Sequence, residues 1–417
     1  MGKRFGFFAG VALVLSALSL LAWVGCSKVS SSTGTLFVAT SGDSLIAPFN
    51  VTLSDGTLAS PGKPAATGAA PVAALFAPSG NTLLLLNTNP CSGGGINCCP
   101  QGGSSCTNAC DGTTVGSITT YTVNSDGSLS AASGSTPTGI CPQGMAMDGA
   151  GTHLFVANSG TINGIGTGTI SVFSLSGGAL TEVSGSPFPT STTVATGPSA
   201  VAVTADGKFL YVANSLINTV TQYDVQVGAD PTDVTLIPQS SYNTATTPSG
   251  AVILPNGGFL YIANSGTNNV SAFAICDTVL ISCSNPNQPD GTLTEVADSP
   301  FPAGLGPLSL AATSDNKFLY VVDAQGNQVS EFKISTGTGA LAANTEAAVS
   351  TGANPVSIAI RAGNTTITAT NGTEDFVFVA NRGAATISSY SFDSTLGVLT
   401  VIAPVTTDGQ PTVVIAK

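Results

Sequence analysis

The stretch PSAVAVTADGKFLYVANSLINTVTQYDV, residues 198–225, decides the fold, because the chain repeats it. Close copies run over residues 248–275 and 307–334. Each copy reads as a small apolar strand after a proline, a polar turn, an aromatic-rich strand, a second turn and a third strand. A fourth strand follows, as in GALTEVSGSPFPT from Gly178. Such near-identity indicates duplication within the chain. Weaker copies begin at Pro71, Pro142 and Pro355.

The two ends of the repeated region each hold part of one further copy. GTLFVATSG from Gly34 lacks the preceding proline strand, and PTVVIA at residues 411–416 is such a strand on its own. Joined, they complete a seventh four-stranded unit. We therefore predict an all-β, seven-bladed β-propeller over residues 34–417, in which the C-terminal strand joins the first blade beside residues 35–40 and closes the ring.

The segment KFLYVANS, residues 208–215, with the Gly/Asn turns of its copies, resembles the YVTN-type repeat of the lactonase-like seven-bladed propellers. The resemblance covers nearly all of residues 34–417. It implies hydrolysis of a sugar lactone such as 6-phosphogluconolactone. We carry over no catalytic residue, because the single histidine, His153, precedes the aromatic strand of its blade and is expected on the rim away from Arg382.

Charge excludes one class of partner. Lys and Arg number 10 and Asp and Glu 22, and removal of Lys3 and Arg4 with an export segment leaves eight cations and a net charge of −14. A chain this acidic is repelled by phosphate backbones, so we expect no nucleic-acid binding.

The first 25 residues have the layout of a secretory signal: two cations, an uncharged run from Phe5 to Val24, and then Gly25-Cys26. The Gly-Cys junction resembles a bacterial lipobox, which implies lipidation of Cys26 and a periplasmic or cell-surface location. The alternative is an uncleaved membrane anchor, since 20 apolar residues can span a bilayer. Residues 26–33 would form a Ser/Thr-rich tether.

Eight cysteines remain after Cys26, and an even number in an exported chain indicates four disulfides. Five lie in a Cys-rich insertion at residues 88–115 of the second blade, so one of them needs an outside partner, and we expect Cys141. Cys276 and Cys283 would form a separate pair. Zinc is disfavoured because no CxxC pair and no histidine occurs in the cluster. The predicted disulfide cysteines are Cys91, Cys98, Cys99, Cys106, Cys110, Cys141, Cys276 and Cys283.

Ligands of propellers usually bind on the rim that carries the turns between the second and third strands. An amide or carboxylate recurs there and could bind a hydroxylated ligand or a cation such as Ca²⁺, although Asn and Asp also start turns for purely local reasons. Arg382 could hold an anionic ligand or balance nearby carboxylates. No cofactor is evident. The rim candidates are Asn158, Asn214, Asn264, Asp323, Asn381 and Arg382.

Two functional hypotheses follow. The first is a lipid-anchored, monomeric propeller that acts as a binding or surface scaffold for a small molecule, a glycan or a protein, with the membrane reached through the lipid. The alternative is a lactone hydrolase of the 6-phosphogluconolactonase-like type. Charged residues around the axis would favour the enzyme, and an uncharged rim would favour the scaffold.

Overall fold

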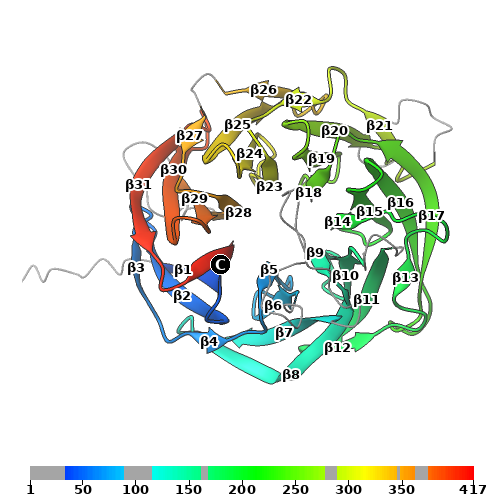
Figure 1. Cartoon of the computed structure of the whole chain (residues 1–417), viewed down its shortest axis with the longest axis horizontal. Coiled ribbons are helices and arrows are strands. Elements are labelled where there is room, and N and C mark those ends of the chain that lie inside the picture. Colours follow the sequence, from blue (N-terminus) through cyan, green and yellow to red (C-terminus); the bar gives the residue numbers. More distant parts are fainter. Residues whose placement is uncertain (1–32, 89–114, 161–167, 278–288, 345–347, 362–373) are drawn as a thin grey trace, which may run out of the picture. The chain divides into compact units, whose positions relative to one another are not determined.

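The chain forms a ring of seven antiparallel sheets around a central axis (Figure 1). The computed structural model describes residues 33–88, 115–160, 168–277, 289–344, 348–361 and 374–417. The predicted all-β, seven-bladed propeller is confirmed. In this part of the chain no helix is long and apolar enough to cross a membrane. The predicted signal segment and most of the Cys-rich insertion lie outside the described residues.

In every blade the strands lie side by side from the axis to the outside. Blade 1 has, in this order, β32 (Gln410–Ala416), β1 (Thr33–Ser41), β2 (Leu45–Thr52) and β3 (Leu58–Pro61), with β4 (Ala65–Ala66) also beside β2. Blade 2 has β5 (Pro71–Phe76), β6 (Thr82–Asn87), β7 (Val115–Val123) and β8 (Leu129–Ile140). Blade 3 has β9 (Pro142–Met147), β10 (His153–Asn158), β11 (Thr169–Ser176) and β12 (Ala179–Glu182), with β13 (Phe188–Pro189) beside β11. Blade 4 has β14 (Pro198–Val203), β15 (Phe209–Asn214), β16 (Thr219–Val227) and β17 (Val234–Asn243).

The remaining three blades follow the same order. Blade 5 has β18 (Pro248–Ile253), β19 (Phe259–Asn264), β20 (Asn269–Ile275) and β21 (Leu293–Glu295), with β22 (Phe301–Pro302) beside β20. Blade 6 has β23 (Pro307–Ala312), β24 (Phe318–Asp323), β25 (Gln328–Ile334) and β26 (Leu341–Ala343), with β27 (Val349–Ser350) beside β25. Blade 7 has β28 (Pro355–Arg361), β29 (Glu374–Asn381), β30 (Thr386–Asp393) and β31 (Leu399–Thr406).

Strand β32 closes the ring. It pairs antiparallel with β1, placing Ala416 opposite Leu36 and Val413 opposite Ala39. This is the pairing predicted from the two incomplete copies at the ends of the repeat. The first blade therefore takes its inner strand from the last residues of the chain, which leaves β1 with a partner on both sides.

The second strand of each blade is buried on both faces because neighbouring blades stack on it. In blade 4, residues 210–213 are 0% exposed, as the unbroken apolar run FLYVA requires. Side chains of this strand belong alternately to the contacts with the two adjacent blades. Val212 packs toward blade 3 and Tyr211 toward blade 5.

A repeated contact fastens each of blades 4, 5 and 6 to the next one. In the contact between blades 5 and 6, the Tyr261 hydroxyl donates to the Gly339 carbonyl at 2.8 Å. Gly339 has a φ of +73°, and a Cβ on it would lie 2.2 Å from the ring of Phe259. Glycine is thus required for both backbone conformation and space. Tyr211 with Gly291 and Tyr320 with Gly397 make the same hydrogen bond.

Candidate functional site

Five of the six predicted rim residues, all but Arg382, end the second strands, but their side chains turn inward beneath the rim. Asn158, Asn264 and Asn381 are 0% exposed. The Asn158 amide donates to Thr169 Oγ1 at 3.2 Å and Ser171 Oγ at 3.0 Å. Asn214 and Asn381 make the same pair of bonds in their blades, and Asn264 reaches an amide oxygen and a serine. These amides fasten the second strand to the third, and a role in ligand binding stays a prediction.

Asp323 is the carboxylate at this position in blade 6. Its Oδ2 accepts hydrogen bonds from Ser330 Oγ at 2.7 Å and from Gln328 Nε2 at 3.2 Å, while its buried Oδ1 has no partner. Burial raises the pKa of Asp323 to about 6. The backbone of Gly304 packs against the carboxylate, so a Cβ there would overlap Oδ2. Five other blades have Asn at this position and blade 1 has Thr40, so a buried carboxylate is particular to blade 6.

A cavity of about 370 Å³ lies on the axis and is lined by the inner strands of all seven blades. It sits where these strands begin, on the rim expected to bind ligands. The third residue of six inner strands is Gly, Ala or Ser, which lets the inner strands of adjacent blades approach closely. At Gly250 a Cβ would lie 2.5 Å from the Leu308 carbonyl oxygen, because adjacent inner strands approach closely there. The six small residues are Ala73, Gly144, Ala200, Gly250, Ser309 and Ser357.

Serines hold part of the cavity wall together. Ser199 Oγ donates to the Pro248 carbonyl at 2.7 Å, and Ser249 Oγ donates to the Pro307 carbonyl at 2.8 Å. Each bond joins the inner strand of one blade to that of the next. The walls formed by blades 4, 5 and 6 are therefore fixed relative to one another before any ligand binds.

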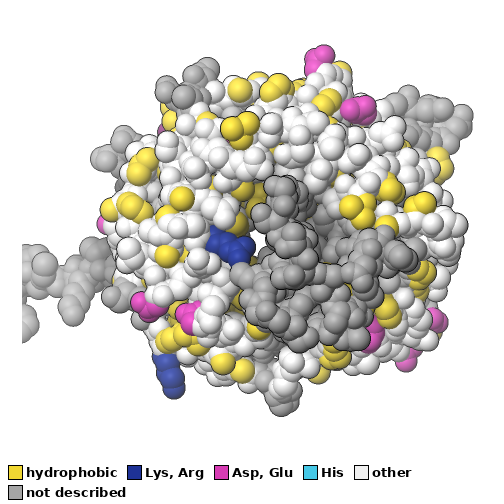
Figure 2. All heavy atoms as spheres, viewed as in Figure 1, with side chains coloured by type: hydrophobic (Ala, Val, Ile, Leu, Met, Phe, Trp, Pro, Cys, Tyr) yellow, Lys and Arg dark blue, Asp and Glu magenta, His cyan; other side chains and the backbone are white. Residues whose placement is uncertain are grey.

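Arg382 is the charged side chain of the cavity. It follows Asn381 in the turn between β29 and β30 and is half-buried. Among the described lining residues, no other side chain is charged. The three ion pairs found in the described part of the chain do not include it. Figure 2 shows few charged side chains among the coloured atoms of one face, with a basic side chain near its centre. A guanidinium in a hollow of this size suits an anion or a polarised carbonyl.

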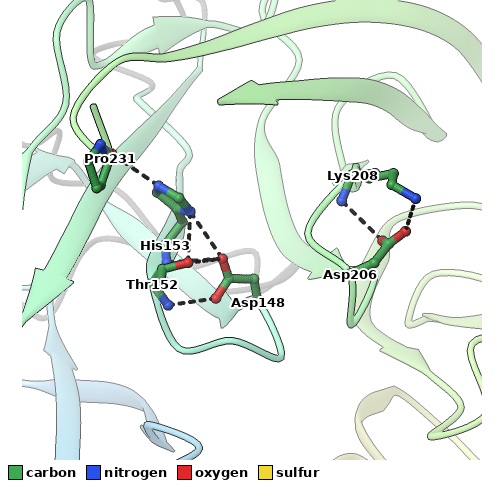
Figure 3. A network of polar contacts seen from close by, with 6 residues as sticks. All are labelled: Asp148, Thr152, His153, Asp206, Lys208 and Pro231. Atoms are coloured by element: carbon green, nitrogen blue, oxygen red, sulfur yellow. Dashed lines mark hydrogen bonds and ion pairs between the residues drawn. The ribbon is translucent and has the colours of Figure 1, made fainter. Parts of the chain in front are cut away.

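His153 lies at the other end of its strand from Asn158, as the sequence predicts, and takes no part in the cavity. Its Nδ1 is 3.0 Å from Asp148 Oδ2 and its Nε2 is 3.0 Å from the Pro231 carbonyl of blade 4 (Figure 3). The hydrogen bond to Asp148 raises the pKa of His153. The imidazole therefore joins blade 3 to blade 4. In the same region Asp206 pairs with Lys208 at 2.9 Å within a turn.

Two of the predicted disulfide cysteines fall on described residues. Cys141 and Cys276 are both buried and both disulfide-bonded. The other six lie outside the described residues, so the predicted pairing stays a prediction. No group of three or more metal-binding side chains is found in the part of the chain that the structure describes.

Three asparagines that hold the turns of this rim were not predicted from the sequence. Asn218, Asn268 and Asn327 occupy one position of the repeat, just before the third strand, and all three have positive φ. Their recurrence was visible in the three close copies. Their role was not, because it depends on contacts with the link that enters the next blade.

Comparison with known proteins gives a family and a fold. A family model described as lactonase, 7-bladed β-propeller, matches residues 166–281 and 276–414, which together span more than half of the chain. No curated protein matches the chain.

Two solved structures are similar over nearly their whole length. One is a Bacteroides fragilis protein provisionally named a 6-phosphogluconolactonase, with a TM-score of 0.68 at 19% identity, covering 94% of this chain and 99% of its own. The other is a periplasmic gluconolactonase of Pseudomonas aeruginosa, with a TM-score of 0.66 at 21% identity, covering 92% of this chain and 99% of its own. At these identities the likeness shows the fold.

Proposed function

Because the chain belongs to the lactonase family of seven-bladed β-propellers, we propose that it hydrolyses a small lactone bound in the axial cavity beside Arg382. The observation that carries this proposal is a guanidinium that lines the cavity and takes no part in the ion pairs of the described residues. The alternative drawn from the sequence, lactone hydrolysis, is thus better supported than a binding scaffold. A charged group at the axis is the feature expected of the enzyme.

Lactone hydrolysis is faster when the negative charge that develops on the carbonyl oxygen is stabilised. Water adds to the lactone carbonyl carbon, the carbonyl oxygen becomes an oxyanion, and the ring C–O bond then breaks to give a hydroxy acid. The Arg382 guanidinium would donate hydrogen bonds to that oxygen and afterwards to the product carboxylate. The described lining contains no carboxylate and no imidazole, so we assign Arg382 an electrostatic role and assign no general base.

Charge also bears on the choice of lactone. A phosphomonoester carries about −1.5 to −2 at neutral pH, and a single guanidinium balances only about half of that. The protein itself has a formal net charge of −12, which repels anions at a distance. A cavity of about 370 Å³ is also within the range of small-molecule sites. We therefore propose a sugar lactone without phosphate as the substrate.

The test is hydrolysis followed by acid release at constant pH. We expect the purified protein to open glucono-δ-lactone faster than the spontaneous reaction and to act poorly on its 6-phosphate. Arg382→Ala should lower kcat/KM about 100-fold, in the range found when an oxyanion donor is removed. Arg382→Lys, which keeps the charge, should retain more activity. Wild-type protein that does not exceed the spontaneous rate, or an active Arg382→Ala variant, would refute the proposal.

We also propose that the protein is exported and anchored by a lipid on Cys26. The support is the apolar run before Gly25-Cys26 and the likeness to a periplasmic gluconolactonase of Pseudomonas aeruginosa. Mass spectrometry of the membrane fraction should find acylated Cys26 as the N-terminus, and Cys26→Ser should abolish the acylation. An intact Met1 in the mature protein would contradict both processing and anchoring.

A further inference from the structure

We infer that Asn327 of blade 6 is a positioning residue for Arg382 of blade 7 and acts through the link that joins the two blades. The functional part of this inference rests on the proposed role of Arg382 in lactone hydrolysis. The structural part is independent of that role, because it concerns only where the guanidinium is held.

Asn327 anchors the link to blade 6. It lies in the turn between β24 and β25 with a φ of +53°, a conformation that Asn and Gly adopt most readily. Its side-chain Oδ1 accepts a hydrogen bond from the Asn354 amide at 2.7 Å. Its backbone carbonyl accepts one from the Thr351 amide at 2.9 Å. One residue thus binds the link at two points, three residues apart.

The same link holds the turn that carries Arg382. The Asn354 carbonyl accepts a hydrogen bond from the Arg382 amide at 2.9 Å. The Ala353 carbonyl accepts bonds from the amides of Gly383 and Ala384, at 3.0 and 3.2 Å. Three successive amides of the turn are therefore docked on residues 353–354. Because Asn354 is bound on one side by Asn327 and on the other by Arg382, a shift of the link moves the arginine relative to the cavity.

The chain contains two matched copies of this device without the arginine. Asn218 Oδ1 accepts a hydrogen bond from the Thr247 amide at 2.8 Å, and Asn268 Oδ1 accepts one from the Gly306 amide at 2.8 Å. Both residues have positive φ, as Asn327 does. Substitution of Asn268 therefore removes the same kind of bond with the same backbone geometry.

The turns held by these two copies differ from that of blade 7. Blade 5 has Ser265 and blade 6 has Ala324 where blade 7 has Arg382. The bond made by Asn268 leads to Ala324, whose side chain carries no charge. Substitution of Asn268 is thus the control for effects that come only from loosening a turn of the rim.

The kinetic test compares three variants. Asn327→Gly keeps a residue suited to positive φ but loses the acceptor, and it should lower kcat/KM for glucono-δ-lactone about three- to tenfold, mainly through kcat, the range for loss of one hydrogen bond. Asn327→Asp keeps the acceptor and should stay within about twofold of wild type. Asn268→Gly should leave kcat/KM unchanged. Equal effects of Asn327→Gly and Asn268→Gly would show a structural role only and overturn the inference.

A second readout separates this inference from the proposed function. The sequence has three arginines, Arg4, Arg361 and Arg382, so the side-chain Nε–Hε region of an NMR spectrum is simple to assign with Arg382→Lys. Asn327→Gly should shift the Arg382 signal and leave that of Arg361 in place, and Asn268→Gly should move neither. An unshifted Arg382 signal in Asn327→Gly refutes the positioning role, whether or not the protein has lactonase activity. A shifted signal in a protein without that activity refutes only the proposed function.

Discussion

Asp323 is expected to destabilise the protein at neutral pH, so Asp323→Asn should stabilise it. The carboxylate is 0% exposed and its Oδ1 has no hydrogen-bond partner. Asn is present at this position in five other blades, and in four of them, as at Asn158, its amide donates to two side chains of the third strand. In blade 6, Ser330 Oγ can accept such a bond and Gln328 can present its side-chain oxygen instead of its nitrogen.

The expected gain in free energy of unfolding follows from the raised pKa of Asp323. Burial raises the pKa of Asp323 from 3.8 to about 6. At about 1.4 kcal/mol per pKa unit, the charged form costs the folded state about 3 kcal/mol above pH 6. Below pH 3.8 the carboxyl is protonated in both states and the penalty is absent. Wild-type stability should therefore fall, relative to the variant, as pH rises from 3.8 to 6, and the difference should be constant above that.

The assay is thermal unfolding of wild type and Asp323→Asn from pH 5 to 8, above the isoelectric point near 4.2. For about 385 residues at about 2.1 cal/mol/K each, 3 kcal/mol corresponds to about 4 °C at pH 8, and the difference should be about half of that at pH 5. The reverse substitution Asn264→Asp in blade 5 should lower Tm with the same pH profile. A variant less stable than wild type at pH 8, or a gain that does not vary with pH, would refute the reasoning.

Three further predictions concern the contacts between blades and the cysteines. Gly339→Ala should lower the free energy of unfolding, measured in urea, by about 2 kcal/mol or more, because φ is positive there and a Cβ would overlap the buried ring of Phe259. Gly337→Ala has open space around it and should leave the free energy of unfolding unchanged. His153→Gln should be less stable than wild type, and the difference in free energy of unfolding should be largest below pH 6.5. The difference from wild type should shrink as pH rises through the raised pKa of His153, and a flat profile from pH 5 to 9 would exclude a charged imidazole. Peptide mapping without reduction should link Cys141 to a cysteine of residues 91–110, and a link to Cys276 or Cys283 would contradict the predicted arrangement.

The repeat made the ring and its closure predictable. Duplication fixes the number of copies, and the incomplete copies at Gly34 and Pro411 can be completed only by each other. The buried second strands were also predictable, because an unbroken apolar run such as residues 209–213 suits a strand covered on both faces.

The candidate site was less predictable from sequence, for two physical reasons. The cavity is lined by short stretches of seven inner strands that lie far apart in the sequence, so no single motif predicts it. The direction of the Asn side chains depends on hydroxyl partners such as Thr169 and Ser171, which turn them beneath the rim. Arg382 was singled out only because cations are rare in this chain, and the structure places it in the cavity lining.

The pairing of β32 with β1 also bears on the order in which the blades fold. The hydroxyl of Ser41 meets the carbonyl of Gln410 across 369 residues of chain, so this contact forms only after nearly all of the polypeptide has been made. Until then the β1 edge is open and the first blade lacks its inner strand, while blades 2 to 7 can each assemble from one continuous segment. Folding can thus begin in the middle of the chain, and we expect the pairing of β32 with β1, which closes the longest loop, to form late and slowly. The ring therefore stays open until residues 410–416 are available to pair with β1.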